Sequence, residues 1–339
     1  MAQVSQGNAE LLSTDSEHNF QYALKRAADL LRAGQVVAVP TETVYGLAAN
    51  ATDAAAVERI FKIKGRPAYN PIIVHVSSVS MAKRCVSRWT LLAGKLARAF
   101  WPGPLTLILS RSEWIPSIVA AGGSTVGVRW PSHPFMQALI RECGFPLAAP
   151  SGNLSNQVSP TLAQHVQASL GRRIALIVDG GPANVGIEST VLDLSVSPPR
   201  VLRPGMIQEA SLRVLTQTLS PLHAISGALK SPGLLPRHYA PRSKLVIWSW
   251  RDVADLHRHC INSGVKSSGI HVIAHRCIPS EAGFSRVVVI PHDPQAFARS
   301  IYAELHRCDQ AGAELIIIEA VPQTDEWAAI CDRLNRASA

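Results

Sequence analysis

The chain has 339 residues, of which 47% are hydrophobic and 17% are charged, a balance that excludes an intrinsically disordered protein. Its formal net charge of +9 and pI near 9.5 favour an anionic partner, and nucleotide, pyrophosphate, RNA and anionic membrane all qualify. No run reaches the roughly 18 apolar residues that span a bilayer, and the N-terminal segment lacks the features of a signal peptide. Six scattered cysteines without a CxxC pair are typical of reduced thiols, so we expect a cytoplasmic protein.

The first predicted elements are a helix and a buried strand that leads into a polar loop. Residues 19–33 carry apolar side chains at helical spacing, and the glycine that follows is a natural helix end. Residues 36–39 form a short apolar run that stops at a proline, which indicates a buried strand. The polar residues 41–43 then fall on a loop, and residues 45–46 are expected to close it as a turn.

A second helix and a second strand follow this loop. Residues 54–63 have apolar side chains at helical spacing, and Thr52 or Asp53 is placed to cap the helix start. The pattern then breaks into the basic loop of residues 64–67, and residues 72–76 read as a strand that contains a histidine. Hydroxyls and cations therefore fall on connections, where binding groups usually lie.

Strands and helices continue to alternate as far as residue 205, which favours an α/β fold with a twisted, largely mixed sheet. The next helix is predicted over 91–100, and a later one is expected to start at 159–161. Further strands are predicted over 105–109, 125–130, 146–150, 174–178, 188–193 and 200–205.

A change of composition between residues 220 and 242, to Pro, Gly, Ser and His, predicts an interdomain linker. Beyond it the strands 244–248, 270–274, 287–290 and 315–319 alternate with the helices 252–262, 294–308 and 326–336. This pattern predicts a smaller doubly wound, Rossmann-like domain, and its lack of a glycine-rich phosphate loop argues against nucleotide binding by this domain alone. We therefore expect a domain of residues 1–220, a linker of 221–242 and a second domain of 243–339.

Two polar loops have the residue types that grip an anion. Lys64 and Arg66 project from one side of an extended loop, where Lys offers a point charge and Arg a planar fork; the alternative is a solvated basic turn. Ser151 and Asn153 place two hydrogen-bonding side chains on one side of a loop, and Gly152 between them allows close backbone approach. The alternative for this second loop is a turn and helix cap.

Two polar residues fall inside predicted strands. His75 is either a core histidine satisfied by a backbone carbonyl or part of a site, and Arg129 among apolar neighbours needs a carboxylate or phosphate. An internal ion pair of Arg129 with Glu42 or Glu188 stays open. The carboxylates near these loops do not cluster, so we assign no protein side chain as a metal ligand and expect Mg²⁺ to be held mainly by substrate phosphates and water.

Seven motifs in a fixed order resemble the YrdC-like threonylcarbamoyl-AMP synthases. They are PTETVYGLAANA (40–51), KGRPAYNPIIVHV (64–76), WPGPLT (101–106), VGVRWP (126–131), APSGNLSNQVSPT (149–161), GIESTVLDL (186–194) and VLRPG (201–205). Linker residues 231–233 and 237–241, followed by a small α/β domain, resemble the long, two-domain form of that family. The resemblance is strong to residue 205 and in the linker, and weaker after residue 243.

The resemblance implies synthesis of L-threonylcarbamoyladenylate from L-threonine, bicarbonate and ATP, with release of pyrophosphate and with Mg²⁺ accompanying ATP. The product would pass to separate proteins that modify adenosine 37 of ANN-decoding tRNAs, and a weak contact with tRNA stays open. One alternative is an RNA-binding module, which the net charge suggests but which lacks aromatics interleaved with its basic residues. The other is an ATP-dependent carbamoyl or acyl transferase that acts on a different amine.

The resemblance also assigns site residues. It implies that the reaction at the nucleotide and its phosphates is carried by Lys64, Arg66, Ser151 and Asn153. It implies further ATP contacts from Asn70, Thr125, Ser159, Arg203 and Tyr239, the last reaching back from the linker over the active site. Around threonine it implies Thr43, His75, Arg129, Ala149 and Ser189. The middle of the linker, residues 234–236, lies where the family varies.

Overall fold

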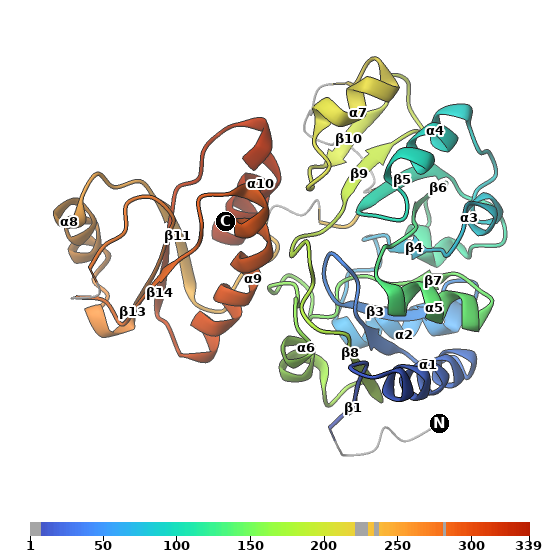
Figure 1. Ribbon diagram of the computed structural model, residues 1–339, viewed down its shortest axis with the longest axis horizontal. Coiled ribbons are helices and arrows are strands. Elements are labelled where there is room, and N and C mark those ends of the chain that lie inside the picture. Colours follow the sequence, from blue (N-terminus) through green and yellow to red (C-terminus); the bar gives the residue numbers. More distant parts are fainter. Residues whose placement is uncertain (1–7, 221–229, 234–236, 281–282) are drawn as a thin grey trace. The chain divides into compact units, whose positions relative to one another are not determined.

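The computed structural model describes residues 8–220, 230–233, 237–280 and 283–339, which form two compact units (Figure 1). The first unit comprises Met1–Ser155 and Ser159–Leu234, and the second comprises Asn156–Val158 and Leu235–Ala339. Much of the predicted linker 221–242 lies outside the described residues. Among the helices that the structure describes, none has the length and apolar character needed to cross a membrane.

The first unit is built on a ten-stranded mixed sheet, as the alternation of elements predicted. Its strand order is β1-β8-β2-β3-β7-β4-β6-β5-β9-β10. The strands are β1 (Glu10–Ser13), β2 (Val37–Val39), β3 (Gly46–Asn50), β4 (Ile73–His75), β5 (Leu105–Ser110), β6 (Thr125–Arg129), β7 (Leu147–Ala148), β8 (Leu176–Asp179), β9 (Thr190–Asp193) and β10 (Arg200–Arg203). The sheet contains both parallel pairs, such as β4 with β6, and antiparallel pairs, such as β5 with β6.

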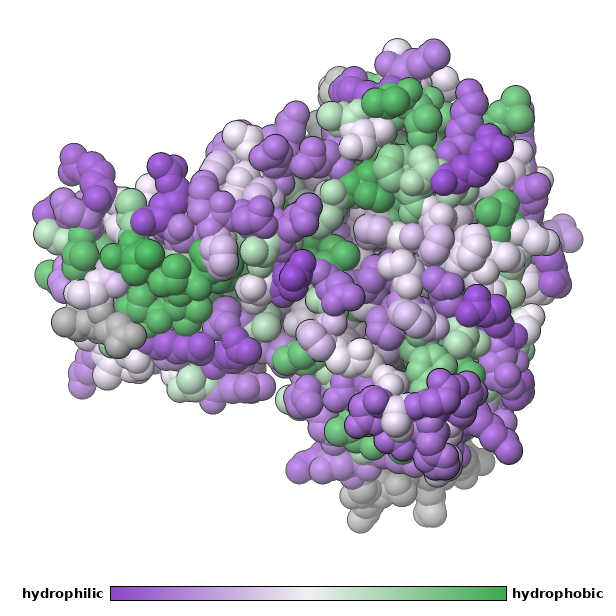
Figure 2. Space-filling model, in the orientation of Figure 1, coloured by the Kyte–Doolittle hydropathy of each residue, from purple (hydrophilic) through white to green (hydrophobic). Residues whose placement is uncertain are grey.

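Helices pack on this sheet, and several begin at a side-chain cap. They are α1 (Glu17–Arg32), α2 (Ala54–Lys64), α3 (Val79–Cys85), α4 (Leu91–Phe100), α5 (Pro134–Cys143), α6 (Ala163–Leu170) and α7 (Glu209–Thr216), with a 3-10 turn η1 (Ser117–Ala120). Asp53 caps α2 by accepting from two backbone N–H groups, which decides between the two predicted caps. Helix α1 buries its alanine and leucine face, and Figure 2 shows hydrophilic side chains over its outer surface.

The two faces of the sheet differ in what covers them. The main core includes Val74, Leu107 and Val128 from neighbouring strands, which all point to one face. Because side chains alternate along a strand, His75, Arg129 and Thr106 point to the opposite face. On that face the core under α1 and α5 includes side chains of β2, β3, β7 and β8, and none from β4, β5 or β6. The polar side chains of these three strands therefore lie beside that core rather than within it.

The second unit has a four-stranded parallel sheet of order β11-β14-β12-β13. Its elements are β11 (Lys244–Trp248), α8 (Val253–Ser263), η2 (Ser267–Gly269), β12 (Ile270–Ala274), β13 (Arg286–Val289), α9 (Pro294–Gln310), β14 (Leu315–Glu319), η3 (Asp325–Trp327) and α10 (Ala328–Ser338). The step from β11 to β12 and the step from β13 to β14 run in opposite directions along the sheet. Right-handed crossovers then place α8 and α9 on opposite faces, as in a doubly wound fold.

Some boundaries differ from the sequence expectations. Gly46 does not close a turn but begins strand β3, because its backbone pairs with Val39 of β2. The helix expected to start at 159–161 begins at Ala163 instead, and it has no side-chain cap. The strand predicted over 146–150 is shortened to the two residues of β7.

Candidate active site

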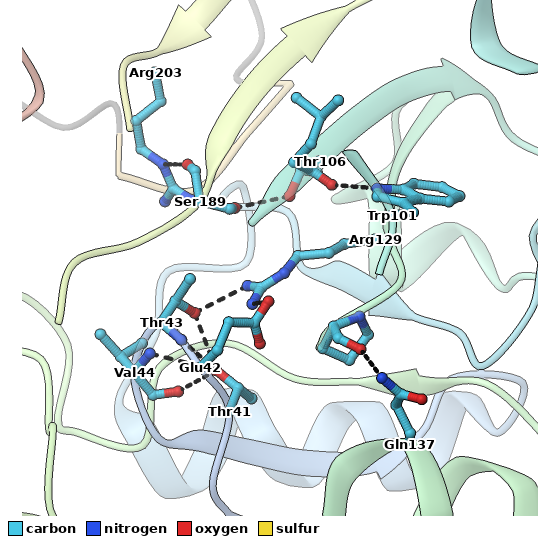
Figure 3. Close-up of polar contacts among 12 residues, drawn as sticks. Thr41, Glu42, Thr43, Val44, Trp101, Thr106, Arg129, Gln137, Ser189 and Arg203 are labelled. Carbon is cyan, nitrogen blue, oxygen red and sulfur yellow. Dashed lines mark hydrogen bonds and ion pairs between the residues drawn. The ribbon is translucent and has the colours of Figure 1, made fainter. Parts of the chain in front are cut away.

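Arg129, at the end of β6, is a buried cation with a buried carboxylate beside it. Its Nη1 donates to Thr43 Oγ1 at 3.0 Å, and its Nη2 lies 2.7 Å from Glu42 Oε1 (Figure 3). Only 4% of the Arg129 side chain and 6% of the Glu42 side chain are exposed. The structure thus selects Glu42 over Glu188 as the predicted ion-pair partner.

The Arg129 guanidinium keeps hydrogen-bonding capacity despite this pair. Its Nε and Nη2 make no hydrogen bond within the described part of the chain, and neither oxygen of Glu42 receives one there. Thr43 is fixed in turn, because its Oγ1 lies 3.0 Å from Thr41 Oγ1. A buried, planar guanidinium that is held in place and still has N–H groups to donate is suited to binding a carboxylate ligand.

His75 lies beside Arg129 in the sheet, because the two residues are register partners of β4 and β6. Burial, together with the charge of Arg129, lowers the pKa of His75 to about 3. The imidazole is therefore neutral at neutral pH. Its Nδ1 has no hydrogen-bond partner among the described residues, but interactions with the backbone of Ile73 and Leu147 act to raise its pKa, so the site role and the core role of His75 both stay open.

Ser189 joins a second arginine to the same sheet. Its Oγ lies 2.8 Å from Thr106 Oγ1 and accepts a hydrogen bond from Arg203 Nη2 at 3.2 Å (Figure 3). Arg203 Nε also donates to the Ser189 carbonyl oxygen. All three side chains are buried, so hydroxyls and guanidinium are held in fixed positions.

Lys64 ends α2 and turns inward rather than into a solvated loop. The left-handed conformation of Gly65 ends the helix, and Lys64 is only 2% exposed. Its Nζ donates to the carbonyl oxygens of Ser151, at 2.5 Å, and of Asn153. Burial and the nearby charge of Arg66 hold the pKa of Lys64 well below its usual range. Lys64 therefore supports the loop that carries Ser151 and Asn153.

Arg66 supports the next connection in a similar way. Its Nε donates to the carbonyl oxygen of Asn70, and its Nη2 donates to Asn70 Oδ1 at 2.7 Å and to the carbonyl oxygen of Pro71. Asn70 is fully buried, so its side chain is held against the guanidinium.

The other predicted residues of the first unit fall on the same loops and strands. Ser159 Oγ donates to Glu188 Oε1 at 2.6 Å, and Glu188 directly precedes Ser189 in the chain. Ala149 follows β7 and pairs its N–H with the carbonyl of Ile73, two residues before His75. Thr125 begins β6 on the face that carries Arg129, because strand side chains alternate.

Tyr239 is placed in the second unit. Its ring is buried and stacks on Tyr302, with 5.9 Å between ring centroids. Its φ of 60° lies in the left-handed region, which L side chains rarely adopt.

At the carboxyl end of β12 in the second unit, backbone donors that could hold an anion are already used. The N–H groups of His275, Arg276 and Cys277 all donate to the carboxylate of Glu319. Ligands of doubly wound sheets usually bind at this end of the strands. The protein's own carboxylate takes that place here.

The residues of the network that were not assigned to the site from the sequence include Thr106, Glu42 and Glu188, of which the two glutamates were named only as possible partners of Arg129. Thr106 is the hydroxyl partner of Ser189, and its signal was a polar residue between apolar neighbours in the strand LTLIL. Glu188 is the carboxylate that fixes Ser159, and it precedes Ser189 in the motif GIEST. Within the described residues no group of three or more His, Cys, Asp or Glu side chains could hold a metal ion.

The chain resembles proteins of one family over nearly its whole length. Residues 29–205 match the Sua5, YciO and YrdC family model, described as telomere recombination, and residues 204–339 match the model of the threonylcarbamoyl-AMP synthase C-terminal domain. The threonylcarbamoyl-AMP synthase of Pyrococcus abyssi is 36% identical, with 94% of each chain covered. That of Bacillus subtilis is 38% identical, with 93% of this chain and 92% of the relative covered.

A solved structure agrees with this assignment. The crystal structure of P. abyssi Sua5 complexed with L-threonine is 35% identical, superimposes with a TM-score of 0.88 and covers 98% of each chain. The fold and the buried polar face define an α/β enzyme of the YrdC-like class. The chain belongs to the threonylcarbamoyl-AMP synthase family.

Proposed function

We propose that this protein makes L-threonylcarbamoyladenylate from L-threonine, bicarbonate and ATP, and releases pyrophosphate. The observation that carries this proposal is the buried Arg129, whose Nε and Nη2 make no hydrogen bond among the described residues. Relatives named threonylcarbamoyl-AMP synthase, and the L-threonine complex of P. abyssi Sua5, support it over an RNA-binding module or a transferase for another amine.

The reaction needs little covalent help from the protein. The threonine amine attacks the carbon of CO₂, which is in equilibrium with bicarbonate; an N–C bond forms and the amine loses a proton. An oxygen of the new carboxylate then attacks the α-phosphorus of ATP, and the bond to the bridging oxygen breaks as pyrophosphate leaves. The protein must bring two anions together, offset their charge and exclude water from the mixed anhydride.

At the threonine end, we assign Arg129 to the α-carboxylate, since its fork can bind two oxygens at once. Thr43 and Ser189 are hydroxyls held by hydrogen bonds to Arg129 and Thr106, and we assign them to the hydroxyl and amine of threonine. A neutral His75 can donate from one ring nitrogen and accept at the other, so it can contact either group. Ala149 forms an apolar part of the wall.

At the ATP end, we assign Arg203 to the phosphates and the loops at Asn70, Ser151 and Asn153 to the nucleotide. We also assign Lys64 and Arg66 to the ATP phosphates, on the family resemblance, and both residues hold these loops through the carbonyl oxygens described above. We also assign Thr125, Ser159 and Tyr239 to ATP, on the family resemblance alone.

Mg²⁺ is part of the proposal and would be held mainly by the ATP phosphates. The described residues fit this role, because the site carboxylates Glu42 and Glu188 already contact Arg129 and Ser159 and form no ligand cluster. When bound, the ion offsets phosphate charge.

The proposal extends to the setting of the reaction. The product passes to separate proteins that modify tRNA. This protein itself contacts tRNA only weakly, and it works in the cytoplasm. The linker of residues 221–242 acts as a lid over the catalytic domain of residues 1–220, and the domain of residues 243–339 supports it.

The test incubates the full chain with ATP, Mg²⁺, bicarbonate and L-threonine and measures threonylcarbamoyl-AMP and pyrophosphate by mass spectrometry. Both products should appear in equal amounts and should depend on all three substrates. Replacing threonine by serine should lower kcat/KM, because the apolar wall loses contact with the methyl group. Absence of product, or equal turnover with serine, would overturn the proposal.

A further inference from the structure

Two arginines of the site, Arg129 and Arg203, differ in the charge around them. Arg129 has the carboxylate of Glu42 at 2.7 Å, and burial leaves no water to screen the pair. Arg203 donates to the carbonyl and hydroxyl oxygens of Ser189 and to the carbonyl oxygen of Pro232, all of which are neutral. Within the described residues, Arg203 contacts no carboxylate.

The Arg129 end of the site is therefore neutral as a whole. Glu42 offsets the one cation, and His75, its neighbour in the sheet, adds no charge because burial and Arg129 lower its pKa to about 3. The hydroxyls of Thr43 and Thr41 complete this end without charge. Arg203 and its neutral oxygen partners keep a net positive charge by contrast.

This difference bears on a problem that the reaction poses. A buried guanidinium binds phosphate as readily as carboxylate, because both present two oxygens to its fork. ATP and pyrophosphate carry several negative charges and must bind next to threonine. An Arg129 with no carboxylate beside it would attract those phosphates into the place of the amino acid.

We propose that Glu42 is a specificity-determining residue that keeps phosphate off Arg129 and leaves that end of the site to a zwitterion. Glu42 lies close enough to cancel the charge of Arg129, and the Nε of Arg129 still makes no hydrogen bond among the described residues. An amino acid brings a carboxylate together with an ammonium and so gains hydrogen bonds without excess charge. A phosphate brings only negative charge and is repelled by the nearby carboxylate.

The inference rests on the proposed function, which places the threonine carboxylate on Arg129. The test is isothermal titration of L-threonine into the full chain without ATP, with excess inorganic phosphate or with sodium chloride at equal ionic strength. In the unsubstituted protein, phosphate should leave the Kd for threonine unchanged relative to chloride. Competition by phosphate in that protein would overturn the inference, whatever the variants do.

The variant Glu42→Gln keeps the shape of the side chain and removes its charge. In this variant phosphate should raise the apparent Kd for threonine about tenfold, since the repulsion is lost. The matched control is Glu304→Gln, which removes a buried carboxylate that pairs with Arg286 in the second unit. No competition should appear in the control. Competition in Glu304→Gln, or none in a folded Glu42→Gln, would contradict the role of Glu42.

A third variant separates this inference from the proposed function. Arg129→Lys keeps the cation beside Glu42 but loses the planar fork, so threonine binding should weaken at least tenfold. Unchanged binding in Arg129→Lys would refute the placement of threonine. Weakened binding there, with no phosphate competition in Glu42→Gln, would refute only the role of Glu42.

Discussion

The side-chain nitrogen of Lys64 lies 2.5 Å from the carbonyl oxygen of Ser151, at the end of a helix and almost fully buried. It also donates to the carbonyl oxygen of Asn153. The two polar loops predicted to bind an anion are thus parts of one structure, in which Lys64 holds the loop that carries Ser151 and Asn153.

Lys64→Met should destabilise the protein and reduce turnover, because it leaves two carbonyl oxygens without their donor. The expected loss is about 2–6 kcal/mol in the free energy of unfolding, from about 1–3 kcal/mol for each of the two unsatisfied groups. Chemical denaturation and steady-state kinetics measure the two effects. Lys62→Met, on the exposed side of the same helix, is the control and should change stability by less than about 0.5 kcal/mol. Equal effects of the two variants would contradict the structural role of Lys64.

Ser189→Ala should raise the KM for threonine about fivefold, which corresponds to one hydrogen bond of about 1 kcal/mol. The KM for ATP should change less, although Arg203 loses one acceptor. Thr106→Val removes only the partner of Ser189 and should give a smaller effect in the same direction. Steady-state kinetics with each substrate varied in turn measures the split. A larger change in the KM for ATP than for threonine would show that Ser189 acts at the nucleotide.

His75 predicts acid sensitivity of the first unit. Its pKa is about 3 in the folded protein and 6.5 in the unfolded chain, so only the unfolded chain binds a proton between these values. Its contribution to stability is complete above pH 6.5 and is lost as the pH falls toward 3, by at most about 1.4 kcal/mol per pH unit. His75→Asn should reduce this slope in denaturation curves, whereas His18→Asn, at an exposed position of α1, should not. An unchanged slope in His75→Asn would rule out the buried neutral imidazole.

Lys230, in the linker, should stabilise the first unit. Lys230 Nζ lies 3.0 Å from Asp193 Oδ2, and the Asp193 side chain is 3% exposed. A chain that ends at residue 220 loses this cation, whereas a chain that ends at residue 233 keeps it. The longer chain should be more stable by about 1 kcal/mol, as expected for a half-exposed pair, and should melt a few degrees higher. Lys230→Met in the longer chain should reduce the difference but not remove it, because the carbonyl oxygen of Pro232 still accepts from Arg203. An unchanged difference would show that the Lys230–Asp193 pair does not contribute.

Elements with strong periodicity could be predicted from the sequence, and elements of small residues could not. The bounds of α4, Leu91–Phe100, and of the strands β11, β12 and β14 agree with the predicted ranges, because each is a long apolar pattern with clear ends. Strand β3 has the sequence GLAAN, whose glycine and alanines have little β propensity. Its strand conformation depends on pairing with β2 and β7, which only the folded sheet supplies.

The site was predictable as a set of residue types but not as a network. Burial of Arg129 in a strand implied a carboxylate partner, yet the choice of Glu42 over Glu188 depends on how the loop after β2 folds back onto β6. Lys64 looked like part of a basic turn, but it is the last residue of α2 and points inward. Sequence spacing does not encode such directions, because they arise from long-range packing.

The most direct test is an experimental structure of this protein with L-threonine and a non-hydrolysable ATP analogue. The account predicts both threonine carboxylate oxygens at about 2.7–2.9 Å from the Arg129 guanidinium, with Glu42 still beside it and the phosphates at Arg203. A phosphate bound to Arg129, or a threonine carboxylate that makes no contact with Arg129, would contradict the account.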